Sequence, residues 1–520
     1  MNQKIWILFK NDLTGSIPFH LLFRSGNQNK GGKITAAVLL LMGILLLAYN
    51  TLTAKTLADM NQGHLIPVYM LSVSSIMMVF LSLLRANGTI FGSSDFEQLS
   101  AYPVSDKEIF ISKLLHLYFF HLLISLPFNL PVLLVWAPNT AASPVFMILF
   151  CITALVTPVI PICIGVILGS FVYHLAAYFR QMNLMAVFLS LILLGIFSYS
   201  TIQASSRAEG MQEIGTALYS QMTSMYLPSV LWQFDSAASS FPILIFLFIS
   251  CLFLVLLIYT GSKYYRKLNL RLLASTVKNN AKQRIIKQRS IFFALWKKEI
   301  ATLFSSYNYL LNSILGTVLL IFLSVALLLF GPEKLTDVVP LPISMETITN
   351  VFPMFIAAML LISNPATAAL SMEGNKLWIL KTLPIEQKRI VQAKLACTFS
   401  LHCFGFSISM IAYVIRLSPN WEQLVWAIVI PVSYSAFITT FGLMLNFFYP
   451  HFSWKNDMYI VKQSPSVFIA ALTGMAIVFV PLALIFFQVI PLFLIYMALS
   501  VLLIGLAVIF YQRTCTIKFL

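Results

Sequence analysis

Ionisable side chains are scarce inside the long apolar segments of this chain, and histidines are the exceptions. His116 and His121 lie in the apolar run at 113–137, and His402 lies in the run at 391–415. Ionisable groups within a membrane commonly mark ion or proton pathways, and an imidazole can accept a proton near neutral pH. The alternative is that each histidine only hydrogen-bonds a neighbouring helix. We therefore treat His121 and His402 as candidate polar contacts of a pathway.

One amphipathic, proline-broken phrase occurs twice. Gln98 to Leu114 reads QLSAYPVSDKEIFISKL, and Ile379 to Leu395 reads ILKTLPIEQKRIVQAKL. A shift of 281 positions superimposes Leu99 on Leu380, Pro103 on Pro384, Lys107 on Lys388, Ile109 on Ile390, Lys113 on Lys394, Leu114 on Leu395 and His121 on His402. This recurrence predicts an internal duplication. Because Pro ends one helix and orients the next, each phrase describes a short helix, a bend and a long span. Such a structure is well placed to dock a soluble partner.

The sequence gives little evidence for catalysis, nucleotide binding, disulfide bonds or zinc binding. The remaining His, Asp, Glu and Ser residues form no recognisable metal or nucleophile signature, so we predict no catalytic, cofactor-binding or metal-binding residue and no enzyme. Asn27 to Thr35 reads NQNKGGKIT, which lacks the first Gly and the final Ser or Thr of a phosphate-binding loop. Any ATP must then bind to another chain. The six Cys lie in or beside apolar runs without a CxxC pair, which argues against disulfides and zinc.

The composition indicates that these histidines and repeated phrases are held by membrane-spanning helices. With 59% hydrophobic and 10% charged residues in 520, the chain cannot cover an apolar core with charge, so it is a polytopic membrane protein. The fold class that we expect is all-α, with about twelve transmembrane helices. The apolar runs lie at about 34–53, 65–84, 113–137, 144–171, 184–203, 241–260, 309–330, 348–369, 391–415, 423–449, 465–488 and 491–511.

Charge predicts the topology. The first 33 residues are polar or amphipathic and show no cleavable signal, so the N-terminus should stay inside. Alternation through twelve spans then places outside, among the 33 Lys and Arg, only Lys55, Arg207, Lys334 and Arg416. This asymmetry is the positive-inside rule, and it predicts cytoplasmic N- and C-termini. The net charge of +16 follows from it, so we expect contact with anionic membrane lipids and no nucleic acid.

The domain organisation follows from these spans as two six-helix repeats in parallel orientation. Residues 1–260 should form the first half, with an interfacial elbow helix at ILFKNDL, a coupling loop at about 85–113 and an external helical cap at about 203–240. Residues 261–294 should form a basic cytoplasmic linker. Residues 295–520 should form the second half, with an elbow helix at LWKKEI and a coupling loop at about 370–394.

The elbow-like helices, six spans per half, the Leu-x-x-x-Pro-[Val/Ile] phrase and the outer helical segment resemble the permeases of ABC-2 type exporters, in the bacterial form with two fused six-span halves. The resemblance implies plasma-membrane localisation and two copies of a cytoplasmic ABC ATPase, which bind ATP and magnesium. It implies export of a hydrophobic or amphipathic lipid, peptide, antibiotic or polymer. The ATPase-coupling residues would be Leu99, Pro103, Val104, Lys107, Glu373, Leu380, Pro384, Ile385 and Lys388.

The two halves depart from the family pattern in the acidic residue that precedes the Leu-Pro phrase. Glu373 lies eleven residues before Pro384, whereas Asp95 and Glu97 lie eight and six residues before Pro103. The external cap also has no equivalent in the second half. We therefore expect the halves to engage ATPases and substrate unequally, and we expect changes at Pro384 or Leu380 to uncouple ATP hydrolysis from transport.

Two other function classes stay open. A self-sufficient secondary transporter or lipid scramblase would also suit twelve spans in two halves, with His121 and His402 in its path. A membrane-embedded enzyme is the weakest alternative, because the sequence contains no catalytic constellation.

Overall fold

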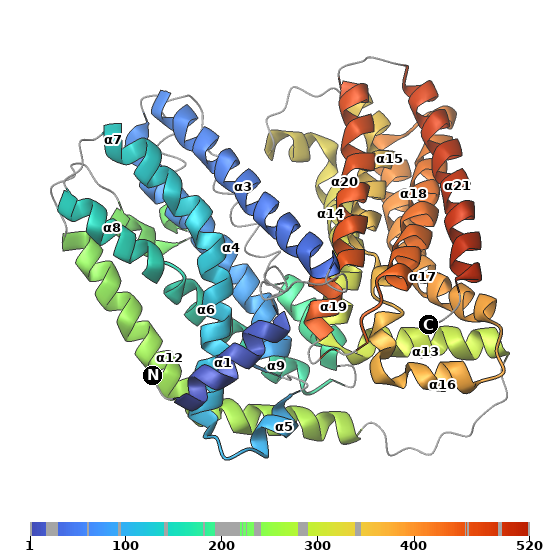
Figure 1. The fold of residues 1–520 in the computed structure, drawn as a ribbon. Coiled ribbons are helices and arrows are strands. Elements are labelled where there is room, and N and C mark those ends of the chain that lie inside the picture. The colour runs from blue at the N-terminus through green and yellow to red at the C-terminus, as the bar shows by residue number, and fades with distance from the viewer. Residues whose placement is uncertain are drawn as a thin grey trace. The chain divides into compact units, whose positions relative to one another are not determined.

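The computed structural model describes residues 3–16, 30–59, 62–91, 95–139, 144–179, 182–192, 219–220, 222–224, 226–232, 241–278, 290–338, 345–452, 454, 457–486 and 491–517. The regular elements within these ranges are helices (Figure 1). The elements of the first half are α1 (Gln3–Ser16), α3 (Lys30–Asp59), η2 (Gly63–Leu65), α4 (Ile66–Thr89), α5 (Phe96–Ser100), α6 (Asp106–Pro131), η3 (Val132–Trp136), α7 (Ala137–Asn139), α8 (Pro144–Val156), α9 (Val159–Ala176), η4 (Leu227–Trp232) and α12 (Phe241–Lys278).

The second half continues with further helices and short 3-10 turns. They are α13 (Ile291–Ser305), α14 (Tyr307–Val338), α15 (Met345–Ile362), η5 (Pro365–Thr367), η6 (Ser371–Lys376), α16 (Leu377–Thr382), α17 (Gln387–Leu417), α18 (Trp421–Phe448), α19 (Asp457–Gln463), α20 (Pro465–Phe486) and α21 (Leu492–Thr516). The chain divides into two compact units, one of Met1–Thr14 and Ala36–Gln283, the other of Gly15–Thr35 and Arg284–Leu520. The first unit therefore carries most of the helices up to α12, and the second carries α13 to α21.

Ten helical segments of the described residues are long and apolar enough to cross a membrane, so the chain is an all-helical, multi-pass membrane protein. They are Gly63–Ala86, Asp106–Trp136, Met147–Ala176, Phe241–Arg271, Tyr307–Pro332, Met345–Thr382, Gln387–Leu417, Trp421–Phe448, Ile460–Ile485 and Leu492–Thr516. Two expected spans are not among the ten. The run at 34–53 lies in α3, and the run at 184–203 is described only as far as a short apolar helix, Met182–Ile192.

Prolines shape two of the long apolar runs. Pro127 and Pro131 lie inside α6, and directly after Pro131 the chain widens into the π-helical turn η3. Proline has no N–H to donate, so a change of hydrogen-bond pattern at this place is expected. The run at 144–171 is two helices, because α8 ends at Val156 and α9 begins after Pro158.

Glycines allow close helix contacts in both units. A Cβ on Gly165 of α9 would lie 2.2 Å from the Cβ of Ser82 in α4, and one on Gly316 of α14 would lie 2.1 Å from the Met359 carbonyl oxygen in α15. Small residues at such crossings let helix backbones approach within a membrane, where packing replaces the hydrophobic effect as the source of association. Each unit therefore has at least one helix pair that tolerates no side chain at the crossing.

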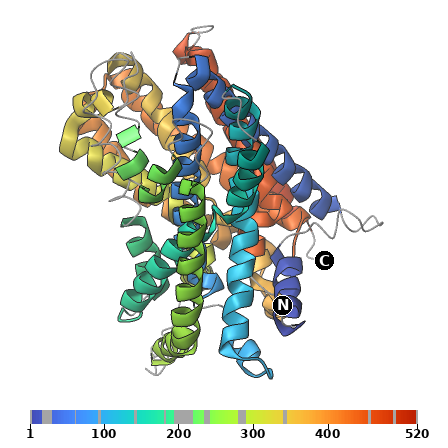
Figure 2. The same cartoon turned by 90° about the vertical axis from the view of Figure 1, so that its left-hand side faces the viewer.

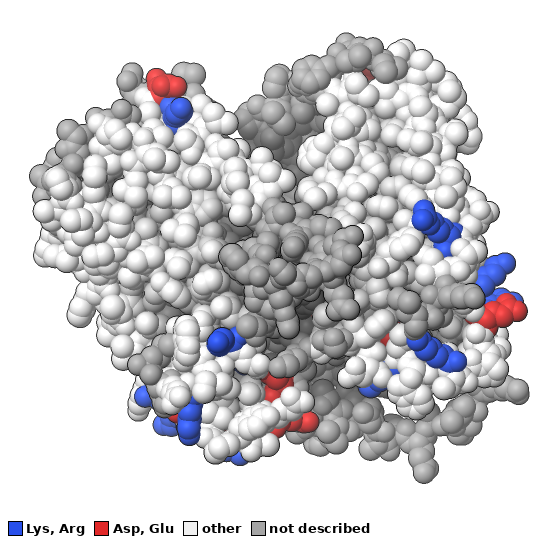
Figure 3. Space-filling view, in the orientation of Figure 1, with Lys and Arg blue, Asp and Glu red and all other residues white. Residues whose placement is uncertain are grey.

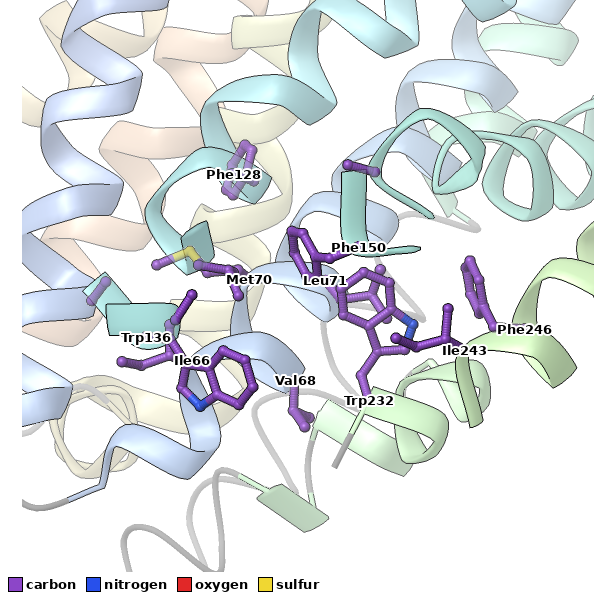
Figure 4. Packing of buried hydrophobic residues seen from close by; sticks show 14 of the residues in the cluster. Ile66, Val68, Met70, Leu71, Phe128, Trp136, Phe150, Trp232, Ile243 and Phe246 are labelled. Carbon is purple, nitrogen blue, oxygen red and sulfur yellow. The ribbon is translucent and has the colours of Figure 1, made fainter. Parts of the chain in front are cut away.

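An apolar cluster in the first unit joins α4, η3, α8 and α12 (Figure 4). Trp232 of η4 lies between Phe150 and Phe246, with ring-centroid separations of 5.3 and 5.6 Å in edge-to-face geometry. Such aromatic contacts add to the free energy gained from burial. The external cap expected at about 203–240 lies largely outside the described residues. Its described parts are residues 219–220, 222–224 and 226–232, and they contribute Tyr226 and Trp232 to this cluster.

Candidate functional site

The coupling segment of the first unit is a short helix, a turn and a capped long helix. α5 ends at Ser100, and α6 begins after Ser105, whose hydroxyl accepts a hydrogen bond from the Glu108 N–H at 3.3 Å. The Ser105 N–H in turn donates to the Glu108 carboxylate at 2.8 Å. This capping box satisfies backbone donors at the start of α6. The Lys4 ammonium of α1 donates to the Pro103 carbonyl at 2.8 Å, so α1 lies beside the turn.

The coupling segment of the second unit is also a short helix followed by a bend. α16 ends at Thr382, Leu383 is extended at φ −76° and ψ 138°, and α17 begins after Glu386. In Figure 1, α13 and α16 run crosswise to α20 and α21. The Gln387 amide donates to the Thr514 carbonyl at 3.1 Å, so the end of α21 lies beside the start of α17. We call the end of each unit that carries its coupling segment the coupling end.

The coupling residues expected from the sequence differ in exposure. Leu380 is buried and belongs to an apolar core with Ile390 and Val391. The Glu373 side chain is also enclosed, at 8% exposed. The other expected residues are exposed or half-buried: Leu99, Pro103, Val104, Lys107, Pro384, Ile385 and Lys388. Leu380 therefore stabilises the fold of the segment, whereas the exposed residues are available at its surface.

A buried ion cluster underlies the coupling segment of the second unit. The Lys394 ammonium, whose side chain is 0% exposed, contacts the carboxylates of Glu299 at 2.9 Å and Glu373 at 2.8 Å. It also donates to the Ala369 carbonyl at 2.8 Å. Lys298 pairs with both glutamates, which balances the charge. These residues come from α13, η6 and α17, so the cluster joins the elbow helix, the coupling segment and a spanning helix.

The first unit has a looser cluster at the corresponding place. The Lys113 ammonium of α6 contacts Asp95, the residue before α5, at 2.5 Å, and Asp12 of α1 at 3.6 Å. The carboxylates are 31% exposed at Asp95 and 16% exposed at Asp12, against 8% or less for the two glutamates of the second unit. Lys113 therefore joins the same three kinds of element through contacts that water reaches more easily.

The duplication places the two clusters in register. Lys113 and Lys394 were already superimposed by the 281-residue shift, and Asp12 and Glu299 occupy the same place when ILFKNDL and LWKKEI are aligned. Sequence reasoning identified both phrases and both lysines, but it did not join them. The signal that could have joined them is the recurrence of one acid in each elbow helix together with a lysine at the eighth position of a long helix, α6 or α17.

The long helix α12 supports the first coupling segment and was not singled out by the sequence. The ring of Tyr265 is buried against Phe96 and Phe110, at centroid separations of 5.7 and 5.9 Å. The Asn269 amide donates to the Ile90 carbonyl at 3.3 Å. Figure 2 shows the end of α12 reaching the same end of the unit as the turn before α6. α12 therefore continues beyond its apolar part to brace α5 and α6.

In the second unit, hydrogen bonds with Asn446, His451 and Trp454 brace the chain before α16. The Asn446 carbonyl oxygen of α18 accepts from the N–H groups of Leu370 and Ser371, at 2.8 and 3.0 Å. The Trp454 indole donates to the Ser371 carbonyl at 2.9 Å. The His451 N–H donates to the Ser371 hydroxyl at 3.1 Å, and burial lowers the pKa of the His451 imidazole. Together these bonds hold the non-helical chain that precedes α16.

The two candidate pathway histidines are buried between helices. His121 bridges the Ser82 hydroxyl at 2.9 Å and the Leu117 carbonyl at 2.7 Å. His402 bridges the Ser435 hydroxyl at 2.7 Å and the Ser363 carbonyl at 2.5 Å. In each ring the nitrogen facing the carbonyl donates, and in the neutral imidazole the other nitrogen accepts from the serine. Both rings are thus hydrogen-bonded to packed neighbours, and a pathway role stays a prediction.

The exposed surface of the coupling segments is partly apolar. In the second unit Trp378 is 63% exposed, and Ile379 and Leu383 are also exposed. In the first unit Tyr102 is 63% exposed. On the face drawn in Figure 3, most Lys and Arg of the first unit gather at the end where α5 lies. The coupling end therefore combines positive charge with exposed aromatic side chains.

A scan against models of protein families finds no match to this chain, and a search of curated proteins finds no similar sequence. Within the described ranges, no group of three or more His, Cys, Asp and Glu residues is arranged to hold a metal ion.

Proposed function

We propose that this chain is the membrane permease of an ATP-driven exporter of the ABC-2 type, and that two cytoplasmic ATPases dock on its coupling segments. The observation that carries the proposal is the recurrence of one arrangement in both units. In each, a buried lysine joins an elbow helix, the chain before a short exposed helix, and a long span. A duplicated cytoplasmic surface suits a partner that is itself present in two copies.

The ion clusters would carry motion from the docked ATPases into the membrane. Glu373 precedes α16, Glu299 belongs to α13 and Lys394 belongs to α17, so a displacement of α16 moves all three elements together. Breaking such a buried pair costs several kcal/mol, on the order of 3–5, so the three elements favour moving as one body. ATP-driven closure of the partners would then tilt the spanning helices and open the pathway outward.

The topology that we propose has twelve spans in two parallel repeats. The chain would lie in a plasma membrane with both termini in the cytoplasm. The positive-inside asymmetry of the 33 Lys and Arg supports this topology. The positions of the two ends of the chain agree with it. Lys4 contacts the first coupling segment, and the end of α21 contacts the start of α17. Each contact lies at a coupling end.

The test is to purify the tagged full-length chain from its native membrane in mild detergent and to identify what accompanies it by native mass spectrometry. We expect two copies of a nucleotide-binding subunit per chain. Trp378→Ala should weaken their retention by roughly thirtyfold, because an exposed tryptophan at an interface is commonly a major contributor to affinity. The matched control is Trp421→Ala, since Trp421 is 79% exposed at the start of α18, on the predicted outer side.

A chain that emerges alone from several mild detergents would overturn the proposal. The self-sufficient transporter or scramblase would then be favoured, and His121 and His402 would be the first residues to change. Equal losses from Trp378→Ala and Trp421→Ala would leave the ATPase partner in place but would remove α16 as its docking element.

A further inference from the structure

A shallow, widely open groove of about 520 Å³ lies beside α17 at the coupling end of the second unit. Phe292 of α13 and Tyr511 of α21 form its sides, and α17 contributes a stripe that includes Arg389, Gln392, Leu395 and Phe399. These α17 residues recur at helical spacing, so they share one face of the helix. Ten residues separate Arg389 from Phe399, so the stripe is about 15 Å long.

The end of the groove nearest the start of α17 is polar and positive. Arg389 is exposed, and among the described residues its guanidinium forms no hydrogen bond or ion pair, including with Glu386 three residues earlier. The Gln392 amide donates to the Tyr511 hydroxyl at 3.2 Å. Arg513 of α21 is occupied elsewhere, because its guanidinium lies 5.2 Å from the Phe448 ring centroid. Arg389 is therefore the cation that lines this groove.

The other end of the groove is apolar and lies within a membrane span. Leu395, Ala396 and Phe399 lie in the apolar run at 391–415, which begins after Arg389. Phe292 adds an aromatic side chain that is 37% exposed. A ligand of this groove must therefore present a negative group at the membrane surface and a hydrocarbon chain directly below it.

We propose that this groove binds an anionic phospholipid of the leaflet at the coupling end. The lipid phosphate would accept hydrogen bonds from the Arg389 guanidinium, whose planar fork matches phosphate geometry. One acyl chain would lie along Leu395 and Phe399. Basic pockets between spanning helices are known to select acidic headgroups on the cytoplasmic side. The proposal needs only a membrane-embedded chain and does not depend on an ATPase partner.

The first unit does not repeat the cation. The position equivalent to Arg389 under the 281-residue shift is Glu108, and its carboxylate is bonded within the capping box of α6. An acidic headgroup would be repelled there. We therefore expect one such lipid per chain, bound to the second unit.

The experiment is to titrate the delipidated full-length chain in detergent with phosphatidylglycerol or phosphatidylcholine and to count bound lipids by native mass spectrometry. The unaltered chain should retain one phosphatidylglycerol in preference to phosphatidylcholine. Arg389→Gln should weaken that retention by roughly tenfold, because a charge-assisted hydrogen bond is lost. The control Lys297→Gln removes an exposed cation of α13 that does not line the groove, and it should have no effect.

A second variant tests whether the lipid needs the volume of the groove as well as the charge of Arg389. Ala396→Trp fills the groove without changing its charge, and it should also release the lipid while the thermal unfolding midpoint stays close to that of the unaltered chain. Unchanged phosphatidylglycerol retention in Arg389→Gln would overturn the proposal. So would equal binding of the two lipids, or an equal loss in Lys297→Gln, because each would show that the groove does not select the acidic headgroup.

Discussion

The two coupling segments share an internal scaffold and differ on their surfaces. Both are anchored by a lysine that the duplication superimposes, Lys113 and Lys394. The exposed positions differ in residue type. Trp378 and Ile379 of the second segment correspond to Glu97 and Gln98 of the first. Burial explains the difference: a charge enclosed with its partners is expensive to change, whereas an exposed side chain is constrained only by what it binds. The duplicated scaffold can therefore present two unlike faces.

The largest expected effect comes from removing the buried lysines. Lys394→Ala should destabilise the second unit by about 3–5 kcal/mol, because it leaves two enclosed carboxylates to share one partly exposed cation, Lys298. Lys113→Ala should cost less, about 2 kcal/mol, because water can reach Asp95 and Asp12 more easily. Chemical unfolding of each variant in detergent measures the difference. Lys297→Ala, an exposed lysine of α13, is the control, and equal losses at the two buried positions would contradict the ranking.

The next effect concerns the exposed faces. Trp378→Ala should lower the affinity for a nucleotide-binding partner by about 2 kcal/mol, whereas Glu97→Ala should change it by less than about 1 kcal/mol, because an exposed charge contributes little. Titration of the purified partner against each variant provides the comparison. If Glu97→Ala proved the more damaging, the first segment would be the principal docking element, and the assignment of the apolar face would be wrong.

The smallest effect concerns the starts of α6 and α17. Glu108→Ala removes one arm of the capping box and should destabilise the first unit by about 1 kcal/mol. Glu386→Ala should have almost no effect, because the Glu386 side chain makes no capping hydrogen bond to α17. Thermal unfolding of the two variants would show a shift in the midpoint for the first alone. A similar shift in both would mean that Glu386 stabilises α17 in solution by another contact.

The apolar segments explain why much of the fold could be predicted. Ten of the twelve expected runs correspond to segments that can span a membrane, because about 20 consecutive apolar residues have few other stable environments. The run at 144–171 was expected as one continuous apolar run, whereas the structure separates α8 from α9 at Pro158. Hydropathy averages over such a break and cannot locate it.

The candidate site was predicted only in part. The duplicated phrase located both coupling segments, since repetition is visible without coordinates. The elbow-helix partners of Lys113 and Lys394 were not found, because Asp12 lies about 100 residues from its lysine and Glu299 lies 95 residues away. Leu380 was expected to act in coupling, and that role stays a prediction. Its burial was not foreseen, because the residue pattern of a six-residue helix does not show which face is covered.

The sequence by itself determined that this is a helical membrane protein with a repeated amphipathic phrase, because hydropathy and repetition are properties of the order of residues. It also determined the charge asymmetry from which the topology is inferred. Only the tertiary structure decided which carboxylates surround Lys394, how Tyr265 braces α5, and where Arg389 meets an apolar groove. Each of these three arrangements depends on contacts between helices that are distant in the chain. Packing and burial determine such contacts, and a local sequence pattern does not show them.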